Sequence, residues 1–337
     1  MRTSASGLWS AACGLLSLVG PAAGAYPPSR TLPRRTVAQF PPGTWIENMA
    51  VRSNGNLLLT SLLPNASVYE VSDPSSDKPK VTRHFTIQDA SGLLGIAEIA
   101  PDVYAIAGGN VSASGTSQKG SFRVWTFDFA ASPKPKLVQT MPDAVLLNGV
   151  TTLPNKEKVI LISDSGLGQV WRVDIPAGKH DVAVKVPEMG SSKQQRPIGV
   201  NGIHIRRGSL TWTNHDTLKM WTVAITPDGN VAPGAKPKQV ATFPATALDD
   251  FIWGPGKENT AWVTTNADNR VFAVSQTGNP VVVAGAKDSI NVSTATACQF
   301  GRTGRDGKTL YVSTGGDSIG GGHGGKVEAL DTNGFRF

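Results

Sequence analysis

Short apolar runs rich in Val, Ile, Leu, Thr and Trp recur along most of the chain, separated by Gly, Pro, Asn and Asp. Such runs, bounded by turn-forming residues, are typical of β-strands. Each group of runs begins with a small or polar residue that leads into an apolar strand. After a turn, a second strand ends in Thr, Ser or Gly, and a third follows an x-Val-x-x-Val/Phe pattern. The pattern therefore predicts an all-β protein.

The groups of runs resemble one another at a spacing of about 45 to 55 residues, which is typical of a repeat array. Six copies of a unit with three to four strands predict a six-bladed β-propeller, and a β-sandwich would not account for them. Because radial stacking buries each sheet between its neighbours, the blades should form one domain. We expect the propeller to span residues 40–337, after an N-terminal extension of residues 26–39. The first strands of the copies are Glu47–Val51, Gly95–Ile99, Asn148–Thr151, Asn201–Ile205, Asp250–Trp253 and Thr296–Phe300.

The composition agrees with this architecture and excludes others. Charged residues make up 17% of the chain, against about 25% in typical proteins, so there are few charges to cover long exposed helices. The 37 Gly and 23 Pro suit a chain rich in turns, and a hydrophobic content of 39% is enough for a large core. A helical bundle and a disordered chain are therefore both disfavoured.

The N-terminus resembles a secretory signal. Residues 1–25 contain a basic Arg2, an apolar stretch at 8–19 and Ala23-Gly24-Ala25, which together match an n-region, an h-region and a cleavage site. The apolar stretch has about 12 residues, whereas a membrane span needs ~20. We therefore expect residues 1–25 to be a cleaved signal peptide, the protein to be secreted or in the secretory lumen, and no membrane span.

Secretion would determine whether the cysteines can form a disulfide and whether asparagines can be glycosylated. Cys13 would leave with the signal, so Cys298 would remain alone and could form no internal disulfide. Cys298 lies in a strand-like run, which favours a buried structural thiol over a reactive one. Three Asn-x-Ser sequons predict N-glycosylation, at Asn65, Asn110 and Asn291.

The formal net charge of +7 does not indicate a nucleic-acid partner. The Lys and Arg residues are scattered, and several alternate with Pro in turn-like stretches. Nucleic-acid-binding proteins gather basic residues with stacking aromatics on one surface. We therefore expect small-molecule partners, and the sequence gives no indication of the oligomeric state.

The first residue of each copy should lie at a similar height around the central channel, because the innermost strand of each blade lines it. Two carboxylates and two amides would converge there, and confined charges need a counter-ion or hydrogen-bond partners. A hard cation such as Ca²⁺ or Mg²⁺ would satisfy oxygen ligands of this kind. Alternatively, the Asn residues cap strand starts and the carboxylates pair with nearby Arg. The predicted ring is Glu47, Gly95, Asn148, Asn201, Asp250 and Thr296.

Four of these residues carry a resemblance to a known family. Glu47, Asn148, Asn201 and Asp250, in blades one, three, four and five, match the metal-ligand pattern of the SMP-30/gluconolactonase/luciferin-regenerating family. The resemblance covers about residues 40–330. It implies a divalent cation that polarises a lactone and activates water. By resemblance, Asp250 would be the general base and a fourth ligand, with Glu47, Asn148 and Asn201 as the other ligands.

A narrower resemblance points to different chemistry. Residues 40–48, 57–62 and 248–251, together with the fungal-style leader, look like a fungal subgroup from secondary-metabolite clusters. That subgroup includes the hetero-Diels–Alderases of tropolone–sesquiterpenoid pathways. The resemblance implies an intermolecular [4+2] cycloaddition between a tropolone-type ortho-quinone methide and a humulene-type alkene, for which no cofactor is required.

The two chemistries make different demands on the channel. Lactone hydrolysis needs an activated water. Cycloaddition needs two reactants held face to face, where effective molarity can supply ~7–11 kcal/mol, and it gains from a hydrogen-bond donor on the diene carbonyl. An apolar, aromatic-rimmed mouth with a few polar anchors would suffice. Candidates for the rim are Trp45, Trp253 and the glycine loop 315–325 with His323, although both Trp could lie between blades and His323 could be a solvated surface residue.

Other catalytic signals are absent from the sequence. There is no Gly-x-Ser-x-Gly elbow, the glycine loop does not match a dinucleotide-binding motif, and the histidines lack zinc spacing. His204, within an apolar run, is expected in the core.

The leading hypothesis is therefore a pericyclase, followed by a metal-dependent lactone hydrolase and then by a non-catalytic ligand-binding propeller. The expected catalytic residues are Asp250 and Glu47, and the expected substrate-binding residues are Asn148, Asn201, Thr296, Trp45 and His323.

Overall fold

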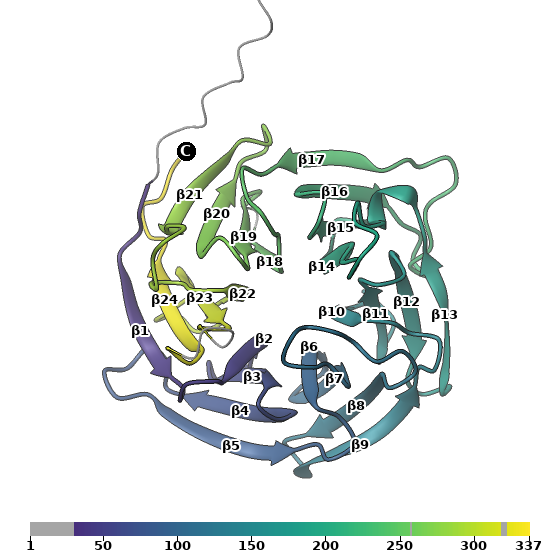
Figure 1. The fold of residues 1–337 in the computed structure, drawn as a ribbon, viewed down its shortest axis with the longest axis horizontal. Helices are drawn as coiled ribbons and strands as arrows, with labels where there is room; N and C mark the ends of the chain where they lie inside the picture. Colours follow the sequence, from purple (N-terminus) through teal and green to yellow (C-terminus); the bar gives the residue numbers. More distant parts are fainter. Residues whose placement is uncertain (1–29, 257, 318–321) are drawn as a thin grey trace, which may run out of the picture.

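The computed structural model describes residues 30–256, 258–317 and 322–337. The predicted signal peptide, residues 1–25, lies outside the described residues. In the described part, the strands form six four-stranded antiparallel sheets arranged around a central axis (Figure 1). The prediction of an all-β, six-bladed propeller is confirmed. None of the described segments forms a helix that is long and apolar enough to cross a membrane.

Each blade runs from an inner strand at the axis to an outer strand at the rim (Figure 1). Blade one contains β2 (Trp45–Val51), β3 (Leu57–Leu63), β4 (Ser67–Ser72) and β5 (Lys80–Thr86). Blade two contains β6 (Gly92–Ala100), β7 (Val103–Gly109), β8 (Arg123–Asp128) and β9 (Ser132–Thr140). Blade three contains β10 (Leu147–Thr152), β11 (Val159–Asp164), β12 (Gln169–Asp174) and β13 (Lys179–Val184).

The remaining blades follow the same order, apart from the last. A short 3₁₀ helix, Pro187–Met189, precedes blade four. Blade four contains β14 (Val200–Arg206), β15 (Ser209–Asn214), β16 (Lys219–Ala224) and β17 (Lys238–Thr242). Blade five contains β18 (Phe251–Trp253), β19 (Ala261–Thr265), β20 (Arg270–Val274) and β21 (Pro280–Gly285). Blade six contains β22 (Ala295–Phe300), β23 (Thr309–Thr314), β24 (Lys326–Asp331) and β1 (Arg34–Gln39).

The ring is closed by the two ends of the chain. β1 pairs antiparallel with β24, with Arg34 opposite Leu330 and Gln39 opposite Lys326. Without β1, β24 would present an unpaired strand edge. Residues 34–39 are therefore the outer strand of blade six, which corrects the predicted boundary between a 26–39 extension and a propeller that begins at residue 40.

Inner strands of neighbouring blades approach closely, and glycine makes this possible. A Cβ atom on Gly95 would lie 2.3 Å from the Asn148 carbonyl oxygen, and one on Gly202 would lie 2.1 Å from Asp250 Oδ1. Hydroxyl groups on second strands bridge the same gaps, since Thr60 Oγ1 donates to the carbonyl of Leu94 in the next blade at 2.6 Å. These contacts explain the Thr and Ser that end the second strand of several copies.

Apolar clusters fill the spaces between adjacent sheets. The cluster between blades five and six contains Cys298, which is 1% exposed and lies among side chains that include Trp262 and Val312. The Cys298 thiol donates to the Trp262 carbonyl at 3.3 Å. Burial raises the pKa of Cys298 well above its ordinary value. The prediction of a buried structural thiol is confirmed.

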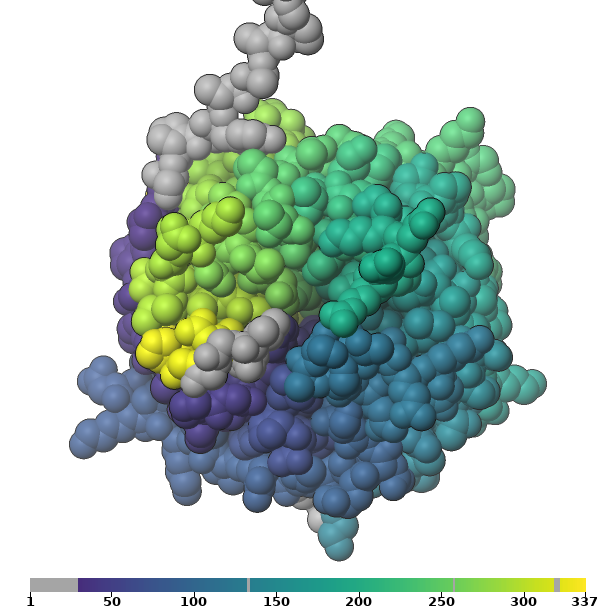
Figure 2. Space-filling model, viewed as in Figure 1, coloured from purple at the N-terminus to yellow at the C-terminus, as the bar shows by residue number. Residues whose placement is uncertain are grey.

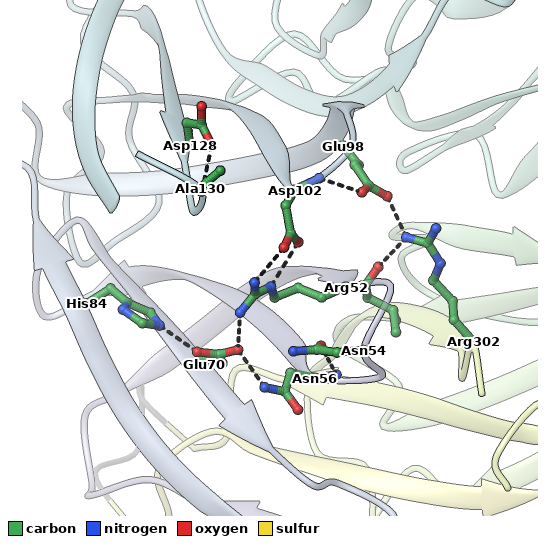
Figure 3. A network of polar contacts seen from close by, with 11 residues as sticks. Arg52, Asn54, Asn56, Glu70, His84, Glu98, Asp102, Asp128, Ala130 and Arg302 are labelled. Carbon is green, nitrogen blue, oxygen red and sulfur yellow. Dashed lines mark hydrogen bonds and ion pairs between the residues drawn. The ribbon is translucent and has the colours of Figure 1, made fainter. Parts of the chain in front are cut away.

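A polar network joins blades one and two near the ends of their inner strands (Figure 3). The Arg52 guanidinium donates to both carboxylate oxygens of Asp102, at 3.0 and 2.7 Å, and to Glu70 Oε1 at 2.8 Å. The other carboxylate oxygen of Glu70 lies 2.7 Å from His84 Nε2. Burial alone would raise the pKa of Glu70, but hydrogen bonds from Asn56, Arg52 and His84 lower it. Arg52 therefore neutralises two carboxylates from different blades.

Candidate functional site

A cavity of about 140 Å³ opens at the end of the channel where the inner strands begin. Loops from several blades meet over the middle of the ring on this face (Figure 2). One contact between them joins blades two and four, where Arg196 Nη1 donates to the Ser114 carbonyl at 3.1 Å. The cavity is lined by Trp45, Glu47, Leu62, Leu63, Leu94, Val111, Ser112, Ala113, Gly115, Leu146, Asn148, Ile198, Asn201, His215, Asp249 and Asn266.

Glu47 enters this cavity from the inner strand of blade one. Its Oε2 atom accepts a hydrogen bond from Trp45 Nε1, on the residue two positions earlier in β2. Burial raises the pKa of Glu47 from its ordinary 4.5 to about 7, against the opposing effect of the Trp45 hydrogen bond and with a further increase from the charge of Asp250. A large share of Glu47 is therefore protonated at neutral pH.

Asp249 enters the cavity from the start of blade five. Its Oδ2 atom accepts a hydrogen bond from Asn266 Nδ2 at 2.8 Å. Burial raises the pKa of Asp249 well above its ordinary value, and the charge of Glu47 raises it further. A buried carboxyl group kept neutral in this way can donate a hydrogen bond through its O–H. Both carboxyl groups in the cavity are thus shifted toward the protonated form, which donates a hydrogen bond.

Asp250, predicted as a catalytic and metal-binding residue, is placed differently. Its Oδ2 accepts from Asn48 Nδ2 at 2.9 Å, and its Oδ1 accepts from the Phe251 backbone N–H at 2.8 Å. His204 Nε2 lies 3.4 Å from Oδ1, without hydrogen-bond geometry. Asp250 is not among the residues that line the cavity, whereas its neighbour Asp249 is. Because the two aspartates are adjacent and precede a short strand, the sequence pattern alone does not show which of them enters the cavity.

The structure brings together four of the other predicted site residues and separates three. Trp45, Glu47, Asn148 and Asn201 share the cavity. The Thr296 hydroxyl is used within the wall, where it donates to the Ile46 carbonyl at 2.8 Å and lies 3.0 Å from Ser313 Oγ. His323 is exposed and, like Thr296, does not line the cavity. Trp253 lies at the far end of its strand, beside another hollow. Residues 318–321 of the glycine loop lie outside the described residues.

A histidine–aspartate pair at the cavity was missed by the sequence analysis. His215 Nδ1 lies 2.9 Å from Asp216 Oδ1, and Asp216 also accepts from Lys193 Nζ at 2.7 Å and from the Ile198 N–H at 2.8 Å. Although burial favours protonation, these partners hold the pKa of Asp216 far below its usual range. Because an ionised carboxylate can only accept, the proton lies on Nδ1 of His215 and leaves Nε2 for a ligand. No sequence pattern marks this pair, since its partners come from a separate loop.

The apolar lining comes from a different part of the ring. Leu62, Leu63 and Leu94 belong to blades one and two, and the loop after β7 adds Val111 and Ala113. Leu146 and Ile198 complete the apolar set from the segments that precede blades three and four. Four polar residues, Asn201, His215, Asp249 and Asn266, come from blades four and five, whereas Glu47, Ser112 and Asn148 come from blades one to three. The apolar side of the cavity, formed mainly by blades one to three, therefore also carries Glu47 and Asn148.

A divalent cation of the kind implied by the resemblance would require Glu47, Asn148, Asn201 and Asp250 to converge. They do not fit it as a set, because Asp250 uses both carboxylate oxygens in hydrogen bonds and lies outside the cavity lining. Within the described part of the chain, no group of three or more His, Cys, Asp or Glu side chains is arranged to hold a metal ion. Asn201 Oδ1 is buried without a hydrogen-bond partner and can accept from a ligand hydroxyl.

The predicted glycosylation sites differ in exposure. Asn65 is exposed, whereas Asn110 and Asn291 are half-buried. The side-chain Oδ1 of Asn291 accepts a hydrogen bond from Arg34 Nη2 at 2.5 Å, and that of Asn110 accepts from the Ser91 N–H at 3.2 Å. Asn65 is therefore the most accessible of the three acceptors.

Two curated fungal proteins are similar in sequence over most of the chain. One, from Phoma sp, is named "Putative hetero-Diels-Alderase" and is 34% identical over 307 residues, covering 84% of this chain and 86% of its own. The second, from Sarocladium schorii, carries the same enzyme name and is 31% identical over 352 residues, covering 91% of this chain and 85% of its own. No protein-family model matches the chain.

Solved structures are similar in fold. Regucalcin from Agrobacterium tumefaciens, described as a calcium-binding protein, aligns with a TM-score of 0.63 at 15% identity, over 90% of this chain and 95% of its own. A luciferin-regenerating enzyme aligns with a TM-score of 0.62 at 12% identity, over 90% of this chain and 96% of its own. At these identities the likeness establishes the propeller fold alone.

Proposed function

The chain belongs to the hetero-Diels–Alderase family that these fungal relatives represent, and on this basis we propose that it catalyses an intermolecular [4+2] cycloaddition. The proposed heterodiene is a tropolone-type ortho-quinone methide, and the proposed alkene is a humulene-type sesquiterpene. In this reaction the exocyclic carbon of the heterodiene bonds to one alkene carbon and the heterodiene oxygen bonds to the other. Three π-electron pairs shift, no atom leaves, and no oxidant or reductant is consumed.

The observation that carries the proposal is the presence of carboxyl groups and a set of apolar side chains in one cavity. Electron density moves from the alkene onto the heterodiene oxygen as the bonds form, and a hydrogen bond donated to that oxygen stabilises the change. The raised pKa values of Glu47 and Asp249 keep such donors available near neutral pH. In the same cavity, Leu62, Leu94 and Val111 offer an apolar surface suited to a hydrocarbon alkene.

Further polar groups are suited to orienting the heterodiene. Asn201 Oδ1, which has no partner, can accept from the ring hydroxyl of a tropolone. His215 Nε2 can bind the same edge of the ring, because Asp216 fixes the opposite nitrogen. Trp45, with its indole N–H bound to Glu47, presents a flat surface beside the donor carboxyl group. These contacts would hold one face of the heterodiene toward the apolar side.

The cavity volume limits which of the two reactants can lie inside it. An apolar cavity of ~150 Å³ accommodates a benzene-sized ring, so a cavity of about 140 Å³ has room for the heterodiene ring but not for both molecules. The alkene would therefore lie across the mouth, between the loop after β7 and the end of β3. Holding the two reactants together in this way can lower the barrier by ~7–11 kcal/mol.

The test uses the purified mature protein with a quinone-methide precursor and a humulene-type alkene, with and without EDTA. A gluconolactone hydrolysis assay runs beside it. We expect one enantiomer of the adduct, formed faster than in the uncatalysed reaction and unaffected by EDTA. EDTA-sensitive lactone opening without adduct would replace the proposal with a metal-dependent lactone hydrolase. Binding of both compounds without turnover would replace it with a ligand-binding propeller.

We also propose that residues 1–25 direct the chain into the secretory pathway and that Asn65 is glycosylated there. Support comes from the signal-like composition of residues 1–25 and from the exposure of Asn65. Mass spectrometry of the protein secreted by a fungal host, before and after removal of N-glycans, tests both points. An N-terminus at Met1 would overturn the first point, and an unmodified Asn65 would overturn the second.

A further inference from the structure

A second hollow, of about 370 Å³, lies between blades four and five at the other end of the ring. Arg206 ends β14 and Trp253 ends β18, and both line this hollow. Asn201, which lines the candidate site, lies five residues earlier on the same strand as Arg206. At about 3.3 Å per residue, the two positions are roughly 16 Å apart. The hollow is therefore separate from the candidate site.

The hollow contains a cation without a carboxylate partner. Arg206 Nη2 donates to the Gly256 carbonyl at 3.0 Å, and its guanidinium lies over the Trp253 ring at 5.2 Å from the centroid. Its Nη1 atom is buried without a hydrogen-bond partner. Among the described residues, neither Arg206 nor the adjacent Arg207 forms an ion pair, and the nearby Glu258 is paired with Lys308. Burial and the charge of Arg207 lower the pKa of Arg206, and the charge of Glu258 opposes them only in part, so a bound anion would stabilise the guanidinium charge.

The rest of the lining combines hydrogen-bonding groups with an apolar wall. The indole N–H of Trp253 is also buried without a partner. The lining also includes the polar residues Ser209, Thr222, Asn259, Ser275 and Gln276 and the apolar residues Val240, Ala261 and Val274. The volume lies within the ~300–1,000 Å³ typical of small-molecule sites. An inorganic anion would use the donors but leave the apolar wall unfilled.

We infer that the hollow between blades four and five binds a small organic anion, namely a carboxylate carried on an apolar body. The carboxylate would accept from Arg206 and the surrounding donors, and the apolar body would lie against Val240 and Val274. A guanidinium is suited to this task because its planar array of N–H groups matches the two oxygens of a carboxylate. This inference does not depend on the proposed cycloaddition.

Isothermal titration calorimetry tests the inference with octanoate as the probe and with octanol and sulfate as comparisons. We expect octanoate to bind at least tenfold more tightly than octanol or sulfate. R206Q should weaken octanoate binding at least tenfold, and R83Q, which changes an exposed arginine on β5, should leave it unchanged. S275W, which fills the hollow from its edge and retains Arg206, should also abolish binding.

Three binding results would contradict the inference or part of it. Equal binding of octanoate and octanol, or full octanoate binding by R206Q and S275W, would overturn the inference. Sulfate binding as tight as octanoate binding would overturn the assignment to an organic ligand. Circular dichroism and thermal unfolding of each variant show whether it is folded, and S275W replaces R206Q as the deciding variant if R206Q does not fold. Adduct formation by both variants should equal that of the unmodified protein, so failure of the proposed function would be seen separately.

Discussion

The carboxyl groups of Glu47 and Asp249, from blades one and five, face the same buried cavity, and the charge of Glu47 adds to burial in raising the pKa of Asp249. Two carboxylates confined together are unfavourable, so the pair tends to retain a proton near neutral pH. The family resemblance assigned this region to a metal-dependent base. Burial of the two carboxyl groups in one cavity instead favours a retained proton, which can be donated in a hydrogen bond.

The pH dependence of the reaction tests the role of Glu47. Its pKa of about 7 means that the donor form is lost as pH rises above 7. We expect the rate of adduct formation, corrected for the uncatalysed reaction, to fall between about pH 6.5 and 8. E47Q, which keeps a donor that does not titrate, should retain activity and lose this decline. A decline of the same size in E47Q would assign the titration to another group.

The same raised pKa predicts a change in stability with pH. Between about pH 4.5 and 7 the folded chain holds a proton on Glu47 that the unfolded chain has released. Stability from this source is therefore complete below pH 4.5 and is lost as pH rises through about 7, by up to about 3 kcal/mol. Urea unfolding at pH 5 and pH 8 should show a larger loss for the unmodified protein than for E47Q. Equal losses would contradict the raised pKa.

Loss of Arg52 should destabilise the junction of blades one and two. R52A would leave Glu70 and Asp102 without their shared cation, and we expect a loss of about 2 to 3 kcal/mol at pH 7. Arg52 lowers the pKa of Asp102, and the network lowers that of Glu70, so their contribution is present above the ordinary carboxylate range and is lost as pH falls below it. The effect of R52A should therefore shrink at pH 3. R83A, on the exposed edge of blade one, is the matched control and should change stability by less than about 0.5 kcal/mol.

The apolar side of the cavity should determine the alkene. Ala113 lies on the exposed loop after β7 and lines the cavity, so A113W should fill the place proposed for the alkene. We expect the KM for the alkene to rise at least tenfold, with a smaller change in the KM for the heterodiene precursor. T116W adds the same side chain to the same loop outside the cavity and should leave both values unchanged. An equal rise in both KM values for A113W would contradict separate binding sides.

Much of the fold could be predicted because each blade of the propeller has a recognisable local sequence pattern. Each blade repeats the same strand signals, so the number of blades and the inner strands follow from the sequence. The role of β1 could not be predicted, because its partner β24 lies at the other end of the chain and the two have no local relationship. The buried position of Cys298 was predictable because an apolar strand surrounds it.

The site was less predictable, because it depends on how side chains from different blades meet. Glu47, Asn148 and Asn201 were predicted to lie together because each is near the start of an inner strand, and all three line the cavity. Asp250 was chosen over Asp249 because repeat alignment cannot resolve adjacent identical residues before a three-residue strand. Thr296 was assigned to substrate although its hydroxyl is used by the neighbouring blade, a contact that only the packed ring reveals.

The most direct test of the central claim compares the unmodified protein with D249A and D249N in the cycloaddition assay at pH 6. We expect formation of one enantiomer by the unmodified protein, a fall in rate of roughly 10²–10³-fold in D249A, and a smaller fall in D249N, which keeps an N–H donor. Circular dichroism shows that the variants are folded. Adduct formation by D249A at the unmodified rate, or a racemic product from all three proteins, would contradict the claim that a neutral carboxyl group in this cavity promotes the reaction.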